Sequence, residues 1–422
     1  MATKKRAAQG SGSIRKRPDG TWEARYTLEK DPKTGLPMAP VRKSVYGATQ
    51  KEVRQKLTQI LADIDDDNYF EPSKMTLAEF LDKVWFPDYM GDKKYLTVKS
   101  YRSQVDNHIK PVLGHIRLSQ LHPHIIQQFY NQLQIDGCKV PQKDDAGELV
   151  RENGNIVYEY VPMSAKSIRN IHGILSKALS IAVKLQYIRS NPAELVTLPR
   201  VQRKELSPLM DTQVKDFLAA VEKDRFSLIF KTILFTGLRI GEACGLTWDC
   251  INFSAGTIKV YRQLQKRPAK DGGLVFATPK NSKTRIIKPA PFVMQYLVEQ
   301  QKQQLAQKLA MGEDWIGWST QKERKTALVF TMENGSGINP ATLWRHFKTI
   351  VAEIGVPECR VHDLRHTFAV LSLQNGDDVK TVQSNLGHAT ASFTLDVYGH
   401  VSDKMREESA ARMQAYFNSL TG

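Results

Sequence analysis

Cysteine is scarce in this sequence, and long apolar runs are missing. The four cysteines among its 422 residues form neither a Cys-x-x-Cys pair nor a Cys/His spacing typical of a zinc site. We therefore expect no disulfide framework and no metal, and reduced thiols fit an intracellular protein. The basic N-terminus runs into glycine and serine, and no stretch approaches the ~18 apolar residues of a membrane-spanning helix. The sequence therefore predicts a soluble protein.

Acidic residues are also too few to balance the basic ones. The chain has 60 Lys and Arg against 44 Asp and Glu, which gives a net charge of +16 and an isoelectric point near 9.5. This excess favours a polyanionic partner, most simply nucleic acid, although solvated basic faces would give the same composition. The length favours two or three domains, and 41% hydrophobic residues are enough for a sizeable core.

The basic charge is concentrated at the N-terminus, where residues 1–60 contain 14 Lys and Arg but only 5 Asp and Glu. Residues 1–12 are expected to form a flexible basic arm. Residues 13–66 predict a β-β-β-α unit: two strands around Pro18-Asp19-Gly20, a third strand at Val41–Tyr46, and a helix of about 16 residues capped by Thr49 and Glu52. The acidic stretch 63–67 is read as a linker.

Basic and aromatic residues interleave in this three-stranded sheet, which suggests a β-ribbon that enters a DNA groove. A solvated edge sheet is the alternative. The candidate DNA-binding residues are Arg15, Lys16, Arg17, Trp22, Arg25, Arg42 and Lys43, with Tyr26 beside them.

Residues 74–196 have the 3.6-residue period of a four-helix domain. Thr76 and Thr97 are the expected N-caps of its first helices, the stretch Pro111-Val-Leu-Gly-His115 is expected to break the second, starting at the proline, and a long helix follows Ser164. The polar stretch 137–162 interrupts the domain and predicts a surface insertion or an extended hairpin. On the last helix, Lys166 and Arg169 either face a phosphate or form part of a solvated face.

Residues 198–207 form a proline-containing, basic linker, and a third domain of mixed helices and strands is expected over 206–400. In Thr236-Gly-Leu-Arg-Ile-Gly-Glu242, Gly237 permits a tight turn and places Arg239 at a helix N-terminus, where it could grip an oxyanion. Glu242 is expected to hold the backbone or Arg239 rather than to perform chemistry.

Further basic and histidine residues follow in short motifs. Pro279-Lys280-Asn-Ser-Lys283-Thr-Arg285 predicts a hairpin tip that carries two lysines. In His362-Asp-Leu-Arg365-His366, the spacing puts His362, Arg365 and His366 on one helix face. His388 follows a Leu-Gly turn, and Tyr398 lies ten residues beyond it.

Two arginines, histidines, a lysine and a tyrosine are the side chains expected for metal-independent phosphoryl transfer. The arginines would neutralise the charge of a pentavalent phosphate, and the histidines would hydrogen-bond its oxygens. The lysine would protonate the leaving 5′ oxygen, and the tyrosine would attack once cationic neighbours favour its phenolate.

Together these motifs, ending in Leu395-Asp-Val-Tyr398-Gly-His400, resemble the tyrosine recombinase (lambda-type integrase) family, and in particular the heterobivalent integrases of phages and conjugative transposons. The resemblance implies an arm-type DNA-binding domain, a helical (SAM-like) core-binding domain and an α+β catalytic domain, hence a multidomain, mainly α fold with small sheets. It implies a phosphate site formed by Arg239, Lys280, His362, Arg365 and His388, with Tyr398 forming a 3′-phosphotyrosine. Lys280 is preferred to Lys283, because the first hairpin lysine is the constant one in similar integrases.

The resemblance also implies an enzyme that integrates and excises a mobile element without metal, ATP or another cofactor. Its expected partners are double-stranded DNA with core-type and arm-type sites, three further copies in a homo-tetramer, and DNA-bending or directionality proteins, in the cytoplasm of a bacterial host at its nucleoid. The tail 401–422 is expected to form a helix that docks on a neighbouring protomer. The alternatives are DNA relaxation of the type IB topoisomerase kind, a non-catalytic DNA-binding regulator and a metal-dependent transposase, but no context for a transposase acidic triad is seen.

Overall fold

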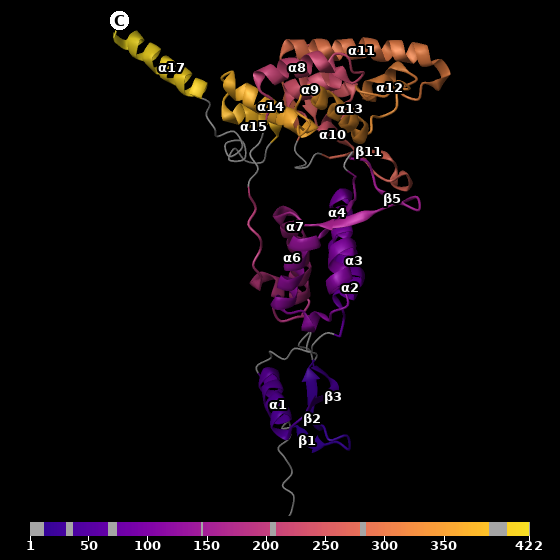
Figure 1. Cartoon of the computed structure of the whole chain (residues 1–422), viewed down its shortest axis with the longest axis vertical. Coiled ribbons are helices and arrows are strands. Elements are labelled where there is room, and N and C mark those ends of the chain that lie inside the picture. The colour runs from indigo at the N-terminus through magenta and orange to yellow at the C-terminus, as the bar shows by residue number, and fades with distance from the viewer. Residues whose placement is uncertain are drawn as a thin grey trace, which may run out of the picture. The chain divides into compact units, whose positions relative to one another are not determined.

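The computed structural model describes residues 12–30, 37–65, 74–144, 147–202, 208–278, 284–387 and 403–421 (Figure 1). The chain divides into two compact units, Met1–Arg203 and Lys204–Gly422, which are described separately. In the described ranges, no helix combines the length and the apolar character needed to cross a bilayer.

The first unit begins with the predicted β-β-β-α arrangement. Strands β1 (Ser13–Lys16), β2 (Trp22–Lys30) and β3 (Pro37–Gly47) form an antiparallel sheet in the order β1-β2-β3, and α1 (Gln50–Asp65) packs on it through Val53 and Leu57. The predicted cap is confirmed, since the Glu52 amide donates to Thr49 Oγ1 at 3.2 Å. The prediction of a linker from residue 63 is wrong in part, because α1 continues to Asp65.

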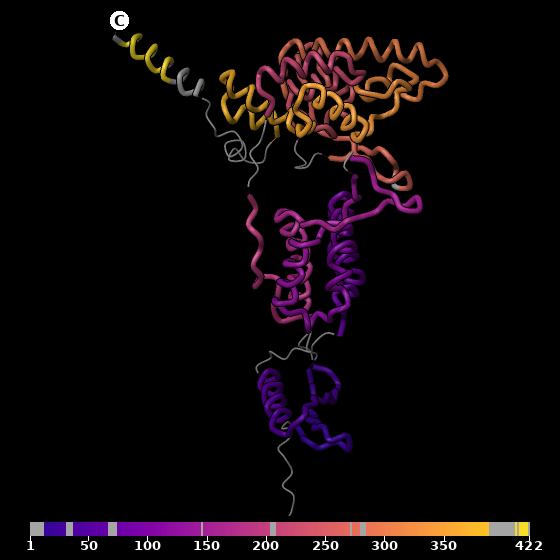
Figure 2. Tube along the Cα trace, in the orientation of Figure 1, coloured from indigo at the N-terminus to yellow at the C-terminus, as the bar shows by residue number. Residues whose placement is uncertain are grey.

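Helices, interrupted by one hairpin, form most of the rest of this unit (Figure 2). One continuous helical segment consists of α2 (Leu77–Phe80), the π-helix Leu81–Trp85 and α3 (Phe86–Tyr89), and a second consists of α4 (Tyr95–Gln104), the π-helix Val105–Ile109 and α5 (Lys110–Leu113). The 3-10 turn Leu118–Gln120, α6 (Pro123–Asp136), α7 (Ala165–Lys184) and the 3-10 turn Pro192–Leu195 follow.

Two expectations for these helices are wrong and one is confirmed. The stretch 111–115 ends its helix, since α5 ends at Leu113, but the expectation that the break starts at Pro111 itself is wrong; a π-helix precedes Pro111, as another precedes Pro87, and the wider turn accommodates a residue that lacks an N–H and crowds the carbonyl four residues back. Thr97 is not the cap, because α4 already begins at Tyr95. Thr76 is a cap: its Oγ1 accepts from the Glu79 amide at 3.3 Å, and Glu79 Oε2 accepts from the Thr76 amide at 3.0 Å.

The stretch 137–162 forms the expected extended hairpin. Strand β4 (Cys138–Pro141) pairs with β7 (Tyr158–Val161), and the short strands β5 (Arg151–Glu152) and β6 (Asn155–Ile156) pair nearer the tip. The hairpin ends at the start of α7, whose N-cap is Ser164.

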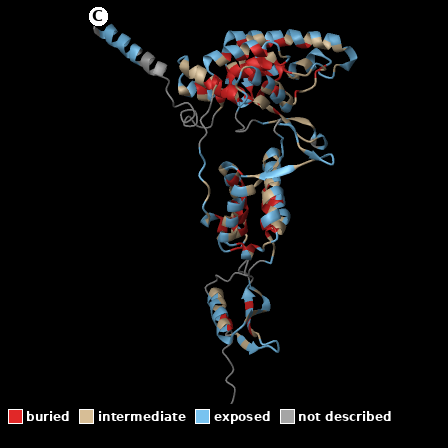
Figure 3. Ribbon diagram, viewed as in Figure 1, coloured by how far each residue is buried: buried red, intermediate tan, exposed pale blue. Residues whose placement is uncertain are grey.

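The second unit is built around α9 (Ser227–Thr236), in which all residues from Leu228 to Leu234 are buried. Figure 3 shows buried residues concentrated at the centre of this unit. Its other helices are α8 (Asp211–Val221), α10 (Ile240–Cys244), α11 (Pro291–Met311), α12 (Gln321–Thr326), α13 (Pro340–Glu353), α14 (Val361–Gln374), α15 (Val379–Leu386) and α17 (Asp403–Thr421). Short 3-10 turns lie at Trp248–Cys250, Ala269–Asp271 and Gly312–Asp314.

The strands of this unit form two small sheets beside α10. β8 (Ile251–Asn252), β9 (Thr257–Val260) and β12 (Arg285–Ile287) make one antiparallel sheet in the order β12-β9-β8. β10 (Gln263–Lys266) pairs with β11 (Leu274–Ala277) in the other. Gly245, at the end of α10, lies against β10 so closely that an added Cβ would be 2.6 Å from the Leu264 amide nitrogen. This contact holds α10, and the arginine before it, close to the strands.

Candidate active site

Arg239 is placed by the turn between α9 and α10. Gly237 has φ +63° and ψ 20°, and its amide donates to Ile233 O at 3.0 Å, which ends α9 as the sequence predicted. A Cβ at Gly237 would lie 2.5 Å from Leu386 Cδ2 and 2.6 Å from Phe368 Cδ1. The turn therefore requires glycine for both its conformation and its packing.

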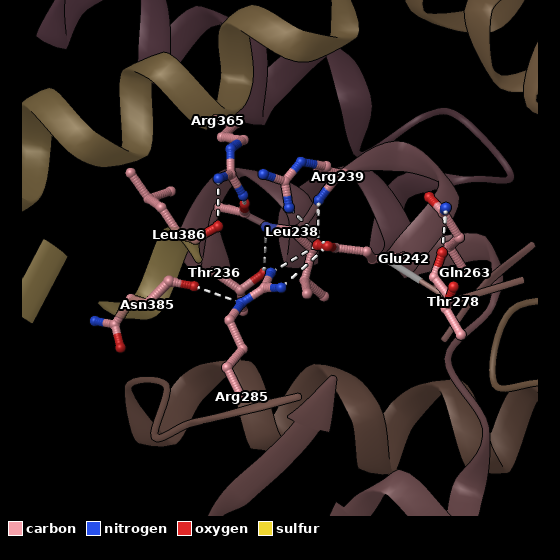
Figure 4. Close-up of polar contacts among 11 residues, drawn as sticks. Thr236, Leu238, Arg239, Glu242, Gln263, Thr278, Arg285, Arg365, Asn385 and Leu386 are labelled. Carbon is pink, nitrogen blue, oxygen red and sulfur yellow. Dashed lines mark hydrogen bonds and ion pairs between the residues drawn. The ribbon is translucent and has the colours of Figure 1, made fainter. Parts of the chain in front are cut away.

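Glu242 anchors Arg239, as expected. Its Oε2 accepts from the Arg239 amide at 3.0 Å, and its Oε1 accepts from Arg239 Nη1 at 2.8 Å. Arg285 donates to the same carboxylate through Nη1 at 3.0 Å and Nη2 at 2.6 Å (Figure 4). Burial would raise the pKa of Glu242, but the hydrogen bonds and charges of the two arginines hold it at about 2. A fully buried, ionised carboxylate thus forms ion pairs with two guanidinium groups.

Arg365 joins segments that are far apart in the sequence. It lies on α14 and is 1% exposed. Its guanidinium donates through Nη1 to Gly237 O and through Nη2 to Leu386 O. One side chain therefore holds the carbonyl two residues before Arg239 and the last carbonyl of α15.

The two histidines of α14 are in contact, as their spacing predicted. The rings of His362 and His366 meet edge to face, with centroids 4.9 Å apart. Burial, followed by the charges of Arg365 and Arg239, lowers the pKa of His362, so this ring is neutral near pH 7. Burial and the charge of His362 lower the pKa of His366 to about 4. The arrangement combines permanent positive charge from arginine with neutral imidazoles that can donate or accept a hydrogen bond.

Lys280, Lys283, His388, Tyr398 and His400 lie outside the described residues, and the described chain ends within two residues of Lys280, Lys283 and His388. Thr278 O, two residues before Lys280, accepts from Gln263 Nε2 at 2.9 Å. Gly387, directly before His388, has φ +64° and caps α15. Among the described residues, no three His, Cys, Asp or Glu side chains gather as they would around a metal ion.

Sequence reasoning did not assign a role to Arg285, although the residue closes one of the quoted motifs. The strand period gives a usable signal, because residues 285 and 287 of β12 lie on one face and residue 286 lies on the other. The structure agrees, since Ile286 is 64% exposed and Ile287 is 3% exposed. Arg285 shares the inward face with Ile287, and an inward-facing arginine requires an acidic partner.

The candidate DNA-binding residues of the arm do not all share one face. Arg15, Arg25 and Arg42 are exposed, and Arg15 and Arg25 donate to Glu23 Oε2 and Oε1 at 2.6 and 3.0 Å. Trp22, which we expected among these cations, packs against the core together with Tyr26. Period-two alternation explains this, because Trp22, Ala24 and Tyr26 alternate with Glu23 and Arg25 along β2 and point to the helix-covered face.

The remaining candidates in the first unit are accessible cations. Lys16 and Arg17 are exposed, and Lys43 is half-buried. On α7, Lys166 is exposed, and Arg169 Nε donates to Pro199 O at 2.8 Å, at the start of the linker.

Comparison with known families identifies two matches. Residues 200–405 match the phage integrase family, and residues 76–134 match the SAM-like N-terminal domain of phage integrases. A tyrosine recombinase described as XerC-like, from Caldanaerobacter subterraneus, is 26% identical over an alignment of 391 residues that covers 89% of this chain and 92% of that protein. The ICEBs1 integrase of Bacillus subtilis is 28% identical over 257 residues, which are 60% of this chain and 66% of the relative.

Solved structures show the same fold. The Tn1549 transposon integrase, in complex with transposon right end DNA, superposes with a TM-score of 0.63 at 20% identity, covering 81% of this chain and all of that one. A lambda integrase dimer bound to a core site superposes with a TM-score of 0.52 at 18% identity, covering 95% of this chain and 98% of that one.

Proposed function

The chain belongs to the phage integrase family, and on that premise we propose that it is a site-specific tyrosine recombinase that integrates and excises a mobile element. The observation that supports this most directly is that Arg239, Arg365 and His362 lie close together. The contact between Arg365 and Gly237 joins segments that are 128 residues apart in the sequence. Two fixed guanidinium groups beside a neutral imidazole suit a phosphodiester whose charge grows during attack.

Arg239 and Arg365 bind the non-bridging oxygens of the scissile phosphate. Each side chain is already held, Arg239 by Glu242 and Arg365 by two backbone carbonyls, so little reorganisation is needed when the phosphate arrives. His362 donates a hydrogen bond to the phosphate or accepts a proton from the attacking tyrosine, and its lowered pKa keeps it neutral for either role.

Tyr398 is the nucleophile. Its oxygen forms a bond to phosphorus, the bond to the 5′ oxygen breaks, and Lys280 supplies a proton to that leaving oxygen. His388 completes the phosphate site together with Lys280. The 3′-phosphotyrosine conserves the energy of the broken bond, so rejoining needs no ATP, and arginine and histidine take the place that a metal holds in other phosphoryl transfers.

The test uses a duplex that is nicked beside the cut site, so that the severed fragment diffuses away and the covalent adduct accumulates. We expect the wild-type protein to form the adduct with EDTA present, and Tyr398→Phe to bind the same DNA without forming it. Failure of the wild-type protein to form an adduct, or an adduct with Tyr398→Phe, contradicts the proposal. Matched DNA affinity of the two proteins is the control for folding.

The first unit recognises DNA through its two domains. The exposed cations Arg15, Lys16, Arg17, Arg25 and Arg42, with Lys43 at the edge of this set, bind an arm-type site, and Lys166 and Arg169 of α7 contact a core-type site. Trp22 contributes by supporting the sheet rather than by touching DNA, since it packs on the core. Replacing Arg42 by alanine is expected to weaken arm-site binding and to flatten its dependence on salt, because one fewer phosphate contact releases fewer counterions.

We further propose a homo-tetramer on two DNA duplexes, in which α17 docks on a neighbouring protomer, with DNA-bending or directionality proteins as additional partners. On α17 the apolar residues Met413, Tyr416, Phe417 and Leu420 follow helical spacing and are 57–68% exposed. Removal of residues 402–422 should abolish cooperative assembly on paired sites while leaving binding to a single site intact. Unchanged assembly would exclude the docking role.

A further inference from the structure

We infer that Arg285 is a positioning residue for DNA cleavage, which couples Arg239 to β12 and to the end of α15. The inference rests on the proposed recombinase function. It concerns a residue that acts on the phosphate through Arg239, which Glu242 holds.

The Arg285 guanidinium makes contacts on two sides (Figure 4). On one side, Nη1 and Nη2 donate to Glu242 Oε1 and Oε2 at 3.0 and 2.6 Å. On the other side, Nε donates to Asn385 O at 2.8 Å, near the end of α15. The side chain of Arg285 is 9% exposed and that of Glu242 is fully buried, so these bonds form away from bulk water.

Each contact leads to a different part of the site. Glu242 also holds the guanidinium and the amide of Arg239. Asn385 lies three residues before His388, and an added Cβ on the intervening Gly387 would lie 3.1 Å from Arg285 Cδ. Arg285 itself follows Lys280 by five residues in the sequence and begins β12. One guanidinium therefore sets the spacing of α10, the start of β12 and the end of α15.

The shared carboxylate gives this arrangement a chemical consequence. With both arginines present, the charge of Glu242 is divided between Arg239 and Arg285. Without Arg285, the buried carboxylate becomes the full counterion of Arg239 and draws its guanidinium away from the phosphate. Loss of Arg285 should therefore slow cleavage through the charge that Arg239 presents, with little effect on DNA affinity.

Arg285→Met and Arg285→Lys test this in the full chain. Methionine removes the charge and keeps an unbranched side chain. Lysine keeps the charge, but one ammonium group cannot reproduce the fork that bonds Glu242 twice and Asn385 once. Arg262→Met is the matched control. Arg262 also lies beside the strands, but its guanidinium donates to Asp249 Oδ1 at 2.8 Å and to Thr247 Oγ1 rather than to Glu242 and Asn385.

The measurement is the single-turnover rate of adduct formation on the nicked duplex, with saturating protein, for two substrates. One substrate carries the normal scissile phosphate and the other an uncharged methylphosphonate at that position. The methylphosphonate develops less negative charge than the phosphate, so the guanidinium charge of Arg239 stabilises its transition state less. A displaced Arg239 should therefore slow cleavage of the methylphosphonate less than cleavage of the phosphate.

We expect Arg285→Met to slow cleavage of the phosphate substrate by ~100-fold and Arg285→Lys by ~10-fold, since removal of one positioned donor costs ~10²–10³ and these variants displace rather than delete it. On the methylphosphonate, both defects should shrink to a few-fold, and Arg262→Met should cleave both substrates like the wild type.

Three results would overturn the inference: unchanged rates in both Arg285 variants, equal slowing on the two substrates, or equal slowing in Arg262→Met. Equal slowing on both substrates indicates a general loss of packing. If Arg285→Met does not fold, Arg285→Lys decides the question by the same comparison. Absence of adduct from the wild-type protein is a different outcome and contradicts the proposed function instead.

Discussion

Replacement of Glu242 by glutamine is the most informative perturbation of the fold around the site. The substitution preserves the shape of the side chain but removes the charge that Arg239 and Arg285 share. Both guanidinium groups then remain at the buried end of α10 without their carboxylate, with side-chain exposures of 24% and 9%. We expect the catalytic unit to become less stable.

The magnitude follows from the titration of Glu242. Its pKa is about 2 in the fold, against 4.5 for an ordinary glutamate, and that difference corresponds to about 3 kcal/mol of folding free energy at neutral pH. The loss of one member of a buried ion pair typically costs ~3–5 kcal/mol, which agrees. Because the folded pKa lies below the unfolded one, this stabilisation is complete above pH 4.5 and is lost as the pH falls toward 2.

Hydrogen exchange measured by mass spectrometry suits this multidomain chain, because it reports each segment separately, whereas a global melting curve mixes the units. At pH 7, the free energy of opening measured in peptides from α9 should be about 3 kcal/mol lower in Glu242→Gln than in the wild type. The difference in opening free energy between Glu242→Gln and the wild type should be about 2 kcal/mol smaller at pH 3, because the wild-type protein has lost much of the same interaction there.

Glu353→Gln is the control for this experiment. Its carboxylate pairs with Lys223 at 3.7 Å on the surface, with side chains 55% and 79% exposed, so its loss should change opening by under ~0.5 kcal/mol. Two results would contradict this role of the Glu242 carboxylate. One is an opening free energy in Glu242→Gln that changes no more than in the control at pH 7, and the other is an equal difference between Glu242→Gln and the wild type at both pH values.

Two further predictions concern the same unit. Gly237→Ala should destabilise α9 by about 2–4 kcal/mol and slow cleavage, since alanine is strained at φ +63° and its Cβ would overlap Leu386 and Phe368; exchange of α9 peptides and adduct formation measure the two effects, and wild-type behaviour in both would contradict it. His366 has a folded pKa of about 4, below its ordinary 6.5, so the wild-type unit should lose stability as the pH falls from 6.5 toward 4. Between pH 6.5 and 4, the opening free energy of α14 peptides should fall by up to about 3 kcal/mol less in His366→Gln than in the wild type. Equal losses in the two proteins would show that His366 does not cause the loss of stability.

Local features of the fold could be predicted because they depend on residues within a few positions of each other. The caps at Thr49 and Thr76, the glycine turn at Gly237 and the edge-to-face pair His362–His366 all have this short range. The errors have local causes as well: a π-helix accommodates Pro111, and strand alternation turns Trp22 toward the core. Neither effect is visible in a reading based on residue type alone.

By itself, the sequence determined the chemistry available to this protein: its basic charge, its domain order and the ordered set of arginines, histidines, lysine and tyrosine. Only the tertiary structure decided which partners those side chains have. Arg365 binds the carbonyls of Gly237 and Leu386, and Arg285 shares Glu242 with Arg239, because packing around α9 brings together segments up to 128 residues apart in the chain. A buried charge is stabilised by whatever polar group the fold places beside it, and no local pattern names that group.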